Sequence, residues 1–134
     1  MTQGTLPAEL IGFLNQYIHS IRQLEALLFF FSHKNEELTS LMVSKALAAD
    51  SEATEKWLTV FHNQGFLSAV HSSPVLFQYK PGTPDLERLV ALLASEYKIR
   101  PLKVIDVIVN RPTQNMMSFM HAFKISKEDK DDDS

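Results

Sequence analysis

The residues best suited to chemistry in this chain are its five histidines, because it contains no cysteine. Imidazole serves as a general base near neutral pH and is the commonest metal ligand. Helical metal sites often carry two histidines four residues apart, a spacing that puts both rings on one face. The histidines here are scattered, with no such pair and no carboxylate at ligand spacing: His19, His33, His62, His71 and His121. We therefore expect no metal site and no cofactor.

Motifs for covalent or phosphoryl chemistry are missing as well. Only four glycines occur, and they form neither a phosphate-binding loop nor a G-x-S-x-G nucleophile turn. Without cysteine there is no thiol nucleophile and no disulfide, which favours a cytoplasmic protein. Trp57 could stack on a ligand, but its place beside Leu58 in an amphipathic run is more typical of packing. The sequence predicts a protein that is not an enzyme.

Length and composition predict one compact unit with an acidic end. The chain has 134 residues, of which 45% are hydrophobic and 10% aromatic, enough for a core. Its formal net charge of −3 arises entirely after residue 125, since residues 1–125 hold 11 basic and 11 acidic side chains. The last nine residues, SKEDKDDDS, offer nothing apolar to bury. We expect residues 126–134 to form a disordered acidic tail.

The sequence also argues against membrane insertion. The opening residues, MTQGTLPAEL, lack the basic and apolar regions of a signal peptide. The longest apolar run, LEALLFFF, contains a glutamate and is far shorter than the roughly 20 residues that a spanning helix needs.

Hydrophobic spacing predicts four helices in the first half of the chain. The first follows Pro7, and Ser20 with Gln23 resembles a capping box for the second. Thr39 or Ser40 is placed to cap the third, and Asp50 with Ser51 the fourth, which Gly65 ends. The inward positions expected in the last two helices are Leu41, Val43, Leu47, Thr54, Trp57, Leu58 and Phe61.

The second half begins with a predicted β-hairpin. The β-favouring runs 66–70 and 75–79 flank the turn residues His71-Ser72-Ser73-Pro74. After a break at Pro81, Thr83 is placed to cap an amphipathic helix. Residues 101–110 are compatible with helix or strand, and the proline at 101 favours helix. A further helix is expected over residues 112–124.

Three helices followed by a hairpin is the order of a winged helix-turn-helix. The segment TSLMVSKALAADSEATEKWLTVFHNQGFL resembles the helix-turn-helix core of bacterial winged-helix transcription regulators of the broad MarR/ArsR type. The resemblance covers about residues 20–82. It implies that residues 48–50 form the turn and residues 51–64 the recognition helix, which in this family enters the DNA major groove. We expect a mainly α protein, with an N-terminal helix at 1–19, a winged-helix domain (three-helix core plus two-stranded β wing) at 20–82 and a C-terminal helical extension at 83–125.

The charge of the expected recognition helix is unusual for DNA binding. The residues expected on its outer face include two glutamates: Ser51, Glu52, Glu55, Lys56 and Thr59. From residue 36 to residue 80 there are five acids and three bases, although DNA affinity comes largely from neutralising phosphates. This charge favours a winged helix used mainly for protein–protein contacts. The alternative is a dimeric transcription regulator that binds double-stranded DNA. Its DNA contacts would then include Lys45, His71, Ser72 and Lys80 besides the residues of the recognition helix.

Apolar residues of the extension are typical of an oligomer or partner surface. They recur at helical spacing in both expected helices: Leu86, Leu89, Leu93, Met116, Met117, Phe119, Met120 and Phe123. If the helices at 84–99 and 112–124 carry more apolar surface than the small winged core can cover, their apolar faces would pair across a twofold axis. We expect a homodimer formed through these helices. The basic group Lys98, Arg100 and Lys103 is either a solvated helix junction or a contact for phosphate or an acidic partner.

Overall fold

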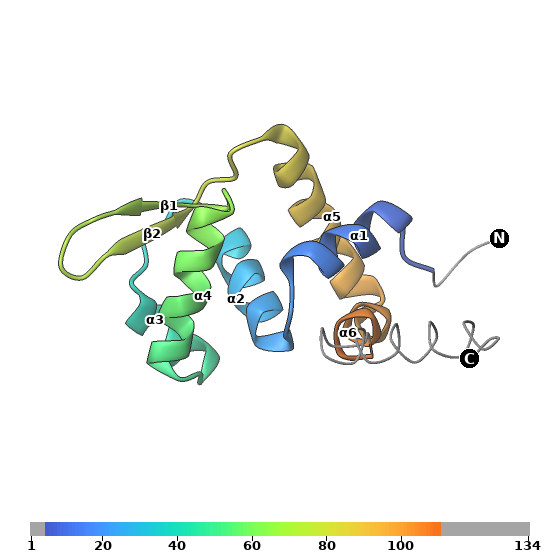
Figure 1. Ribbon diagram of the computed structural model, residues 1–134, viewed down its shortest axis with the longest axis horizontal. Coiled ribbons are helices and arrows are strands. Elements are labelled where there is room, and N and C mark those ends of the chain that lie inside the picture. Colours follow the sequence, from blue (N-terminus) through green and yellow to red (C-terminus); the bar gives the residue numbers. More distant parts are fainter. Residues whose placement is uncertain (1–4, 111–134) are drawn as a thin grey trace, which may run out of the picture.

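The computed structural model describes residues 5–110, which form six helices and one antiparallel hairpin. In chain order these are α1 (Ala8–Tyr17), α2 (Ile21–Ser32), α3 (Ser40–Leu47), α4 (Ser51–Asn63), β1 (Leu67–Val70), β2 (Leu76–Tyr79), α5 (Pro84–Ile99) and α6 (Pro101–Val109). The hairpin projects from one end of the molecule, α1, α5 and α6 lie at the other, and α2 runs between them (Figure 1). The mainly α winged-helix prediction is confirmed, and residues 101–109 are helical.

Capping side chains define the starts of four helices. The side-chain oxygens of Ser20, Thr39, Asp50 and Thr83 each accept a hydrogen bond from a backbone N–H in the first turn that follows, at 2.9–3.1 Å. Each bond satisfies a donor that has no partner inside its helix. Gly65, with a φ of +94°, follows the last turn of α4 in the left-handed region that glycine favours. The predicted caps and the predicted stop are confirmed.

The winged unit packs α3 against α4 and closes on the hairpin. Val43 and Leu58 are fully buried between the elements. Leu38, just before α3, exchanges two backbone hydrogen bonds with Phe77 of β2, at 2.7 and 2.8 Å, and so adds a short bridge to the sheet. These bonds fix the loop between α2 and α3 against the wing.

One predicted core position in α3 is wrong. Leu41 is 53% exposed, whereas Ser44 is 3% exposed and occupies the inner face. Residues two apart on a helix point about 200° apart, so Leu41 and Val43 cannot face the same way. Fewer apolar residues of α3 are therefore buried than its sequence predicts.

An aromatic cluster joins the N-terminal helix to the winged unit. Phe66, fully buried just after α4, meets Phe13, Tyr17 and Phe61 edge to face, with ring centroids 5.1–5.8 Å apart. Such edge-to-face pairs add to the free energy of burying the rings. The cluster therefore makes α1 part of the same core as α4.

The two last described helices pack on α1 and α2. Val90, Leu93 and Val104 are fully buried there, and Arg88 of α5 forms an ion pair with Glu9 of α1 at 2.9 Å.

Leu93 was wrongly placed on the expected oligomer surface, because the contact between α5 and its neighbours covers it completely. Leu86 and Leu89 are half-buried against the core. The large apolar side chains exposed here are instead Ile99, Leu102 and Val109. The predicted helix at 112–124, with Met116, Met117, Phe119, Met120 and Phe123, lies outside the described residues, as does the acidic tail.

Candidate nucleic-acid interface

Helix α4 presents the predicted polar face to solvent. Its buried side is formed by Thr54, Leu58 and Phe61, each at most 1% exposed. The opposite side carries five exposed residues that together we term the recognition-helix face: Ser51, Glu52, Glu55, Lys56 and Thr59. All five are exposed, and their role as a recognition surface stays a prediction. Thr59 donates its hydroxyl proton to the Glu55 carbonyl at 2.9 Å, which leaves its oxygen free to accept a further bond.

The turn before α4 is fixed by backbone and side-chain bonds. Ala48 adopts the left-handed conformation, with φ 53°, and the N–H of Ala49 donates to the Ser44 carbonyl at 2.9 Å. The Asp50 carboxylate accepts a bond from the N–H of Ala53 at 2.9 Å, and the Thr54 hydroxyl donates to the Asp50 carbonyl at 2.7 Å. The carboxylate therefore lies at the positive end of the α4 dipole, which offsets its charge.

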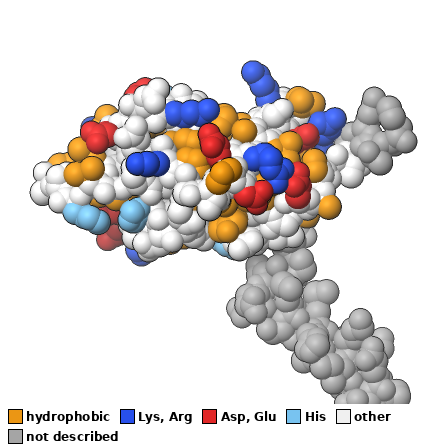
Figure 2. Space-filling view, turned by 90° about the horizontal axis from the view of Figure 1, so that it is seen from above, with side chains coloured by type: hydrophobic (Ala, Val, Ile, Leu, Met, Phe, Trp, Pro, Cys, Tyr) orange, Lys and Arg blue, Asp and Glu red, His pale blue; other side chains and the backbone are white. Residues whose placement is uncertain are grey.

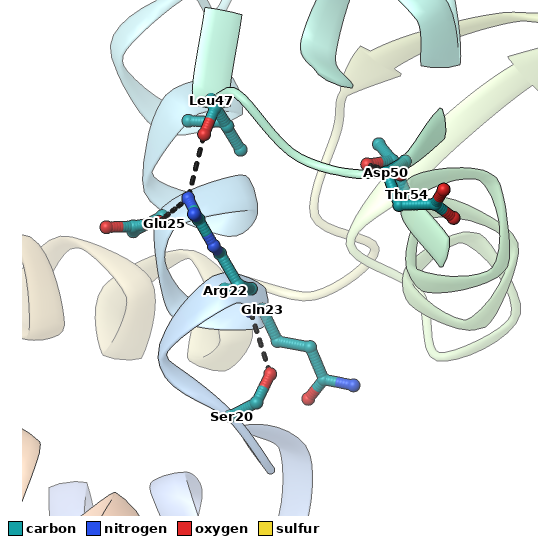
Figure 3. Close-up of polar contacts among 7 residues, drawn as sticks. All are labelled: Ser20, Arg22, Gln23, Glu25, Leu47, Asp50 and Thr54. Carbon is teal, nitrogen blue, oxygen red and sulfur yellow. Dashed lines mark hydrogen bonds and ion pairs between the residues drawn. The ribbon is translucent and has the colours of Figure 1, made fainter. Parts of the chain in front are cut away.

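Arg22 of α2 ties the end of α3 to the rest of the protein. Its Nη1 atom donates to the Leu47 carbonyl at 2.7 Å and lies 3.1 Å from Oε1 of Glu25 (Figure 3). A cation at a helix C-terminus also interacts favourably with the helix dipole. Sequence reasoning missed Arg22, because its partner is a backbone carbonyl 25 residues further along the chain. This contact sets the position of the turn relative to α2.

Replacing Arg22 with methionine is expected to lower the free energy of unfolding by about 1 kcal/mol. The variant keeps the side-chain stem but loses a charge-assisted hydrogen bond that is half-exposed to solvent. Urea denaturation followed by far-UV circular dichroism measures the change. Glu25→Gln is the control, since it removes the ion pair and keeps the bond to Leu47. Equal midpoints for the two variants and the wild type would show that the bond does not stabilise the turn.

The wing tip is exposed but internally bonded. His71 and Ser72 are exposed, and the Ser72 hydroxyl donates to the Pro74 carbonyl at 2.7 Å. The ring of His71 lies 6.3 Å from that of His62 at the end of α4, and Nδ1 of His62 is 2.8 Å from the Leu67 carbonyl. The wing thus contacts the end of the recognition helix, although the two histidines are nine residues apart in sequence.

The basic residues of the described part of the chain lie on several different elements. Lys45 on α3, Lys56 on α4 and Lys80 after β2 are all exposed, and Lys80 also lines a hollow at the base of the wing. In the group near Pro101, Arg100 is paired with Glu96 at 2.7 Å, so only Lys98 and Lys103 keep exposed side chains. Figure 2 shows acidic and basic side chains interspersed over the face that it presents. Within residues 5–110, no three histidine or carboxylate side chains are placed to hold a metal ion.

Comparison with known proteins establishes the fold. No family model and no curated protein matches the sequence. Among solved structures, the F27L mutant of MepR from S. aureus, bound to an oligodeoxyribonucleotide, matches with a TM-score of 0.53 at 15% identity, covering 87% of this chain and 82% of that chain. MepR, a transcription regulator of the Staphylococcus aureus multidrug efflux pump MepA, matches with a TM-score of 0.52 at 16% identity, and the match covers 87% of this chain and 82% of that chain. The reduced form of MarR from E. coli matches with a TM-score of 0.50 at 13% identity, and the match covers 86% of this chain and 82% of that chain.

The fold is therefore that of MarR-type winged-helix transcription regulators, and the predicted resemblance is confirmed at the level of architecture. None of the helices in the described part of the chain has the length and apolar content to cross a membrane.

Proposed function

We propose that the protein is a transcription regulator that binds double-stranded DNA through α4 and the wing. The observation that carries the proposal is the free polar face of α4 beside a projecting hairpin. The same arrangement, over 87% of this chain, matches a solved regulator bound to an oligodeoxyribonucleotide. In this geometry the recognition-helix face enters the major groove and the wing lies along the backbone.

This proposal replaces the protein-contact role that the charge alone favoured. One structural neighbour is bound to an oligodeoxyribonucleotide and another is a transcription regulator, and neither supports that role. Of the three acids at the start of α4, Asp50 is engaged as a cap, and Glu52 lies in the first turn where the helix dipole favours a carboxylate. Asp50 and Glu52 therefore stabilise the start of α4, although their negative charge lowers the affinity for DNA.

The chain offers separate residues for positioning and for reading DNA. Lys45 and Lys56 supply ammonium groups for phosphates, which fix register without reading sequence. Ser51 and Thr59 supply hydroxyls that can meet base edges. His71 at the exposed tip of the wing would add a contact to the DNA backbone.

The terminal helices would bring two such units together. The exposed apolar residues of α5 and α6, Ile99, Leu102 and Val109, would pair across a twofold axis with those of a second copy. A homodimer presents two recognition helices to half-sites and doubles the number of phosphate contacts. Dimerisation would therefore compensate for the small number of basic residues in a single winged unit.

Fluorescence anisotropy with a mixed-sequence labelled duplex tests DNA binding directly. We expect micromolar binding at about 50 mM salt that weakens at least tenfold at about 200 mM, because phosphate contacts release counterions. A labelled duplex carrying the protein's own operator would bind more tightly and with less salt dependence. If the full-length protein bound no duplex at the lower salt, the proposed function would be wrong.

A further inference from the structure

A polar hollow lies at the base of the wing, and none of its lining residues belongs to α4. This wing-base pocket has a volume of about 440 Å³. It is formed by the loop between α2 and α3, the hairpin and the start of α5. The residues that line it and matter for its chemistry are Lys34, Asn35, Ser68, Gln78, Tyr79 and Lys80.

The walls of the pocket are joined by hydrogen bonds. Nε2 of Gln78 donates to the Lys34 carbonyl at 3.2 Å, next to the backbone bridge between Leu38 and Phe77. On the other side, the N–H of Lys80 donates to the Phe66 carbonyl at 2.9 Å. The lining residues are thus held by the fold itself, as in binding sites that exist before their ligand arrives.

The chemistry of the pocket favours an anion. Lys34 and Lys80 contribute two exposed ammonium groups, and Asn35 and Ser68 contribute an amide and a hydroxyl. Glu87 at the start of α5 is the single carboxylate in the lining, so the formal charge of the lining is +1. A small anion would be attracted to this set of donors.

Tyr79 adds a donor that needs a partner. The side chain is 7% exposed, and its hydroxyl has no hydrogen-bond partner among residues 5–110. Burial, and then the nearby Glu87 carboxylate, raise the pKa of Tyr79 to about 12, so the hydroxyl keeps its proton at neutral pH. The ring of Phe31 holds the tyrosine edge to face at 5.8 Å and also lies 4.3 Å from the Lys34 ammonium. A buried donor left unpaired costs stability, which a bound acceptor would restore.

We propose that the wing-base pocket binds a small phosphate-bearing anion. Lys34 and Lys80 would neutralise its charge, while the hydroxyl of Ser68 would donate to its oxygens. The Tyr79 hydroxyl is covered in this structure and would donate to the anion after its ring turns toward the pocket. The ligand would join the loop that leads into α3 to the end of the wing strand. Occupancy would then set the angle between helix-turn-helix and wing, and so regulate DNA affinity. Only this regulatory consequence rests on the proposed function, since binding of the anion does not require DNA.

Isothermal titration calorimetry with inorganic phosphate, at constant ionic strength set by chloride, tests the pocket on the full chain. We expect saturable binding that the double variant Lys34→Gln/Lys80→Gln weakens about tenfold or more, and Tyr79→Phe about fivefold, from the loss of charge-assisted bonds. The control is Lys98→Gln/Lys103→Gln, which changes the net charge equally. Both lysines are exposed and neither lines the pocket, so we expect this variant to bind phosphate like the wild type and the group near Pro101 to be a solvated helix junction.

Three results would overturn the proposal. The first is heat that does not saturate, and the second is binding that the Lys34/Lys80 variant retains. The third is a DNA affinity, measured without phosphate, that the Lys34/Lys80 variant loses and the control keeps, because those lysines would then contact DNA. Thermal unfolding of each variant checks that it is folded. Failure of the proposed function appears separately, as saturable phosphate binding by a protein that binds no duplex.

Discussion

Phe66→Ala is expected to lower the free energy of unfolding by about 3–5 kcal/mol, the largest stability effect of the substitutions considered. Phe66 is fully buried and lies against three other aromatic rings, from α1 and α4. Removing it leaves a cavity at the joint between these helices. Because a domain of this size is stable by only about 5–15 kcal/mol, the loss is a large share of the total.

Urea denaturation followed by Trp57 fluorescence measures this loss. Phe29→Ala is the control, because Phe29 is half-buried and stacks on His33 at a ring distance of 4.2 Å. Its loss should be less than half that of Phe66→Ala. Equal losses for the two variants would mean that the aromatic cluster does not hold α1 to α4.

Glu52→Gln/Glu55→Gln is expected to tighten binding to duplex DNA about tenfold at low salt, because it removes two carboxylates from the face that approaches phosphates in the proposed complex. Both residues are exposed on α4, so the substitution leaves the core unchanged. The salt dependence of binding should change little, since no phosphate contact is added. Anisotropy titrations at several salt concentrations give both quantities.

The matched control is Glu36→Gln/Glu37→Gln, on the exposed loop before α3. It makes the same change in net charge at a site outside the recognition-helix face. We expect it to strengthen DNA binding by less than about twofold, because exposed charges beyond a Debye length are screened. If both double variants tightened binding equally, the effect would be one of net charge, and α4 would not be the DNA-contacting element.

Local chemistry explains what could be predicted from the sequence. Side-chain caps such as Thr39 and Thr83 act on backbone groups three residues away, and Gly65 ends a helix through its own conformational freedom. These interactions are encoded within a few residues. The hairpin and the polar face of α4 follow from periodicity in the same way.

Tertiary contacts account for what could not be predicted. Leu93 has the same apolar character as an interface residue, and only the packing of α5 shows that it is internal. The bond from Arg22 to Leu47 and the pocket containing Lys34 and Tyr79 each join residues more than 20 positions apart. No local sequence pattern marks such pairs. The prediction of a protein-contact role therefore rested on the net charge of residues 36–80, which does not show where each charged side chain lies.

Helix α4 is anchored at both ends. Arg22 holds the turn before it, and after it the N–H of Gly82 donates to the Gly65 carbonyl at 2.8 Å. Its 13 residues span about 20 Å, so a tilt of about 5° at one end would displace the other by about 2 Å. In the proposed DNA complex, such a displacement would break a hydrogen bond to a base edge. Anchoring at both ends fixes the orientation of α4 in the free protein. Docking on the proposed DNA site would therefore lose little further conformational entropy, because folding has already ordered the helix.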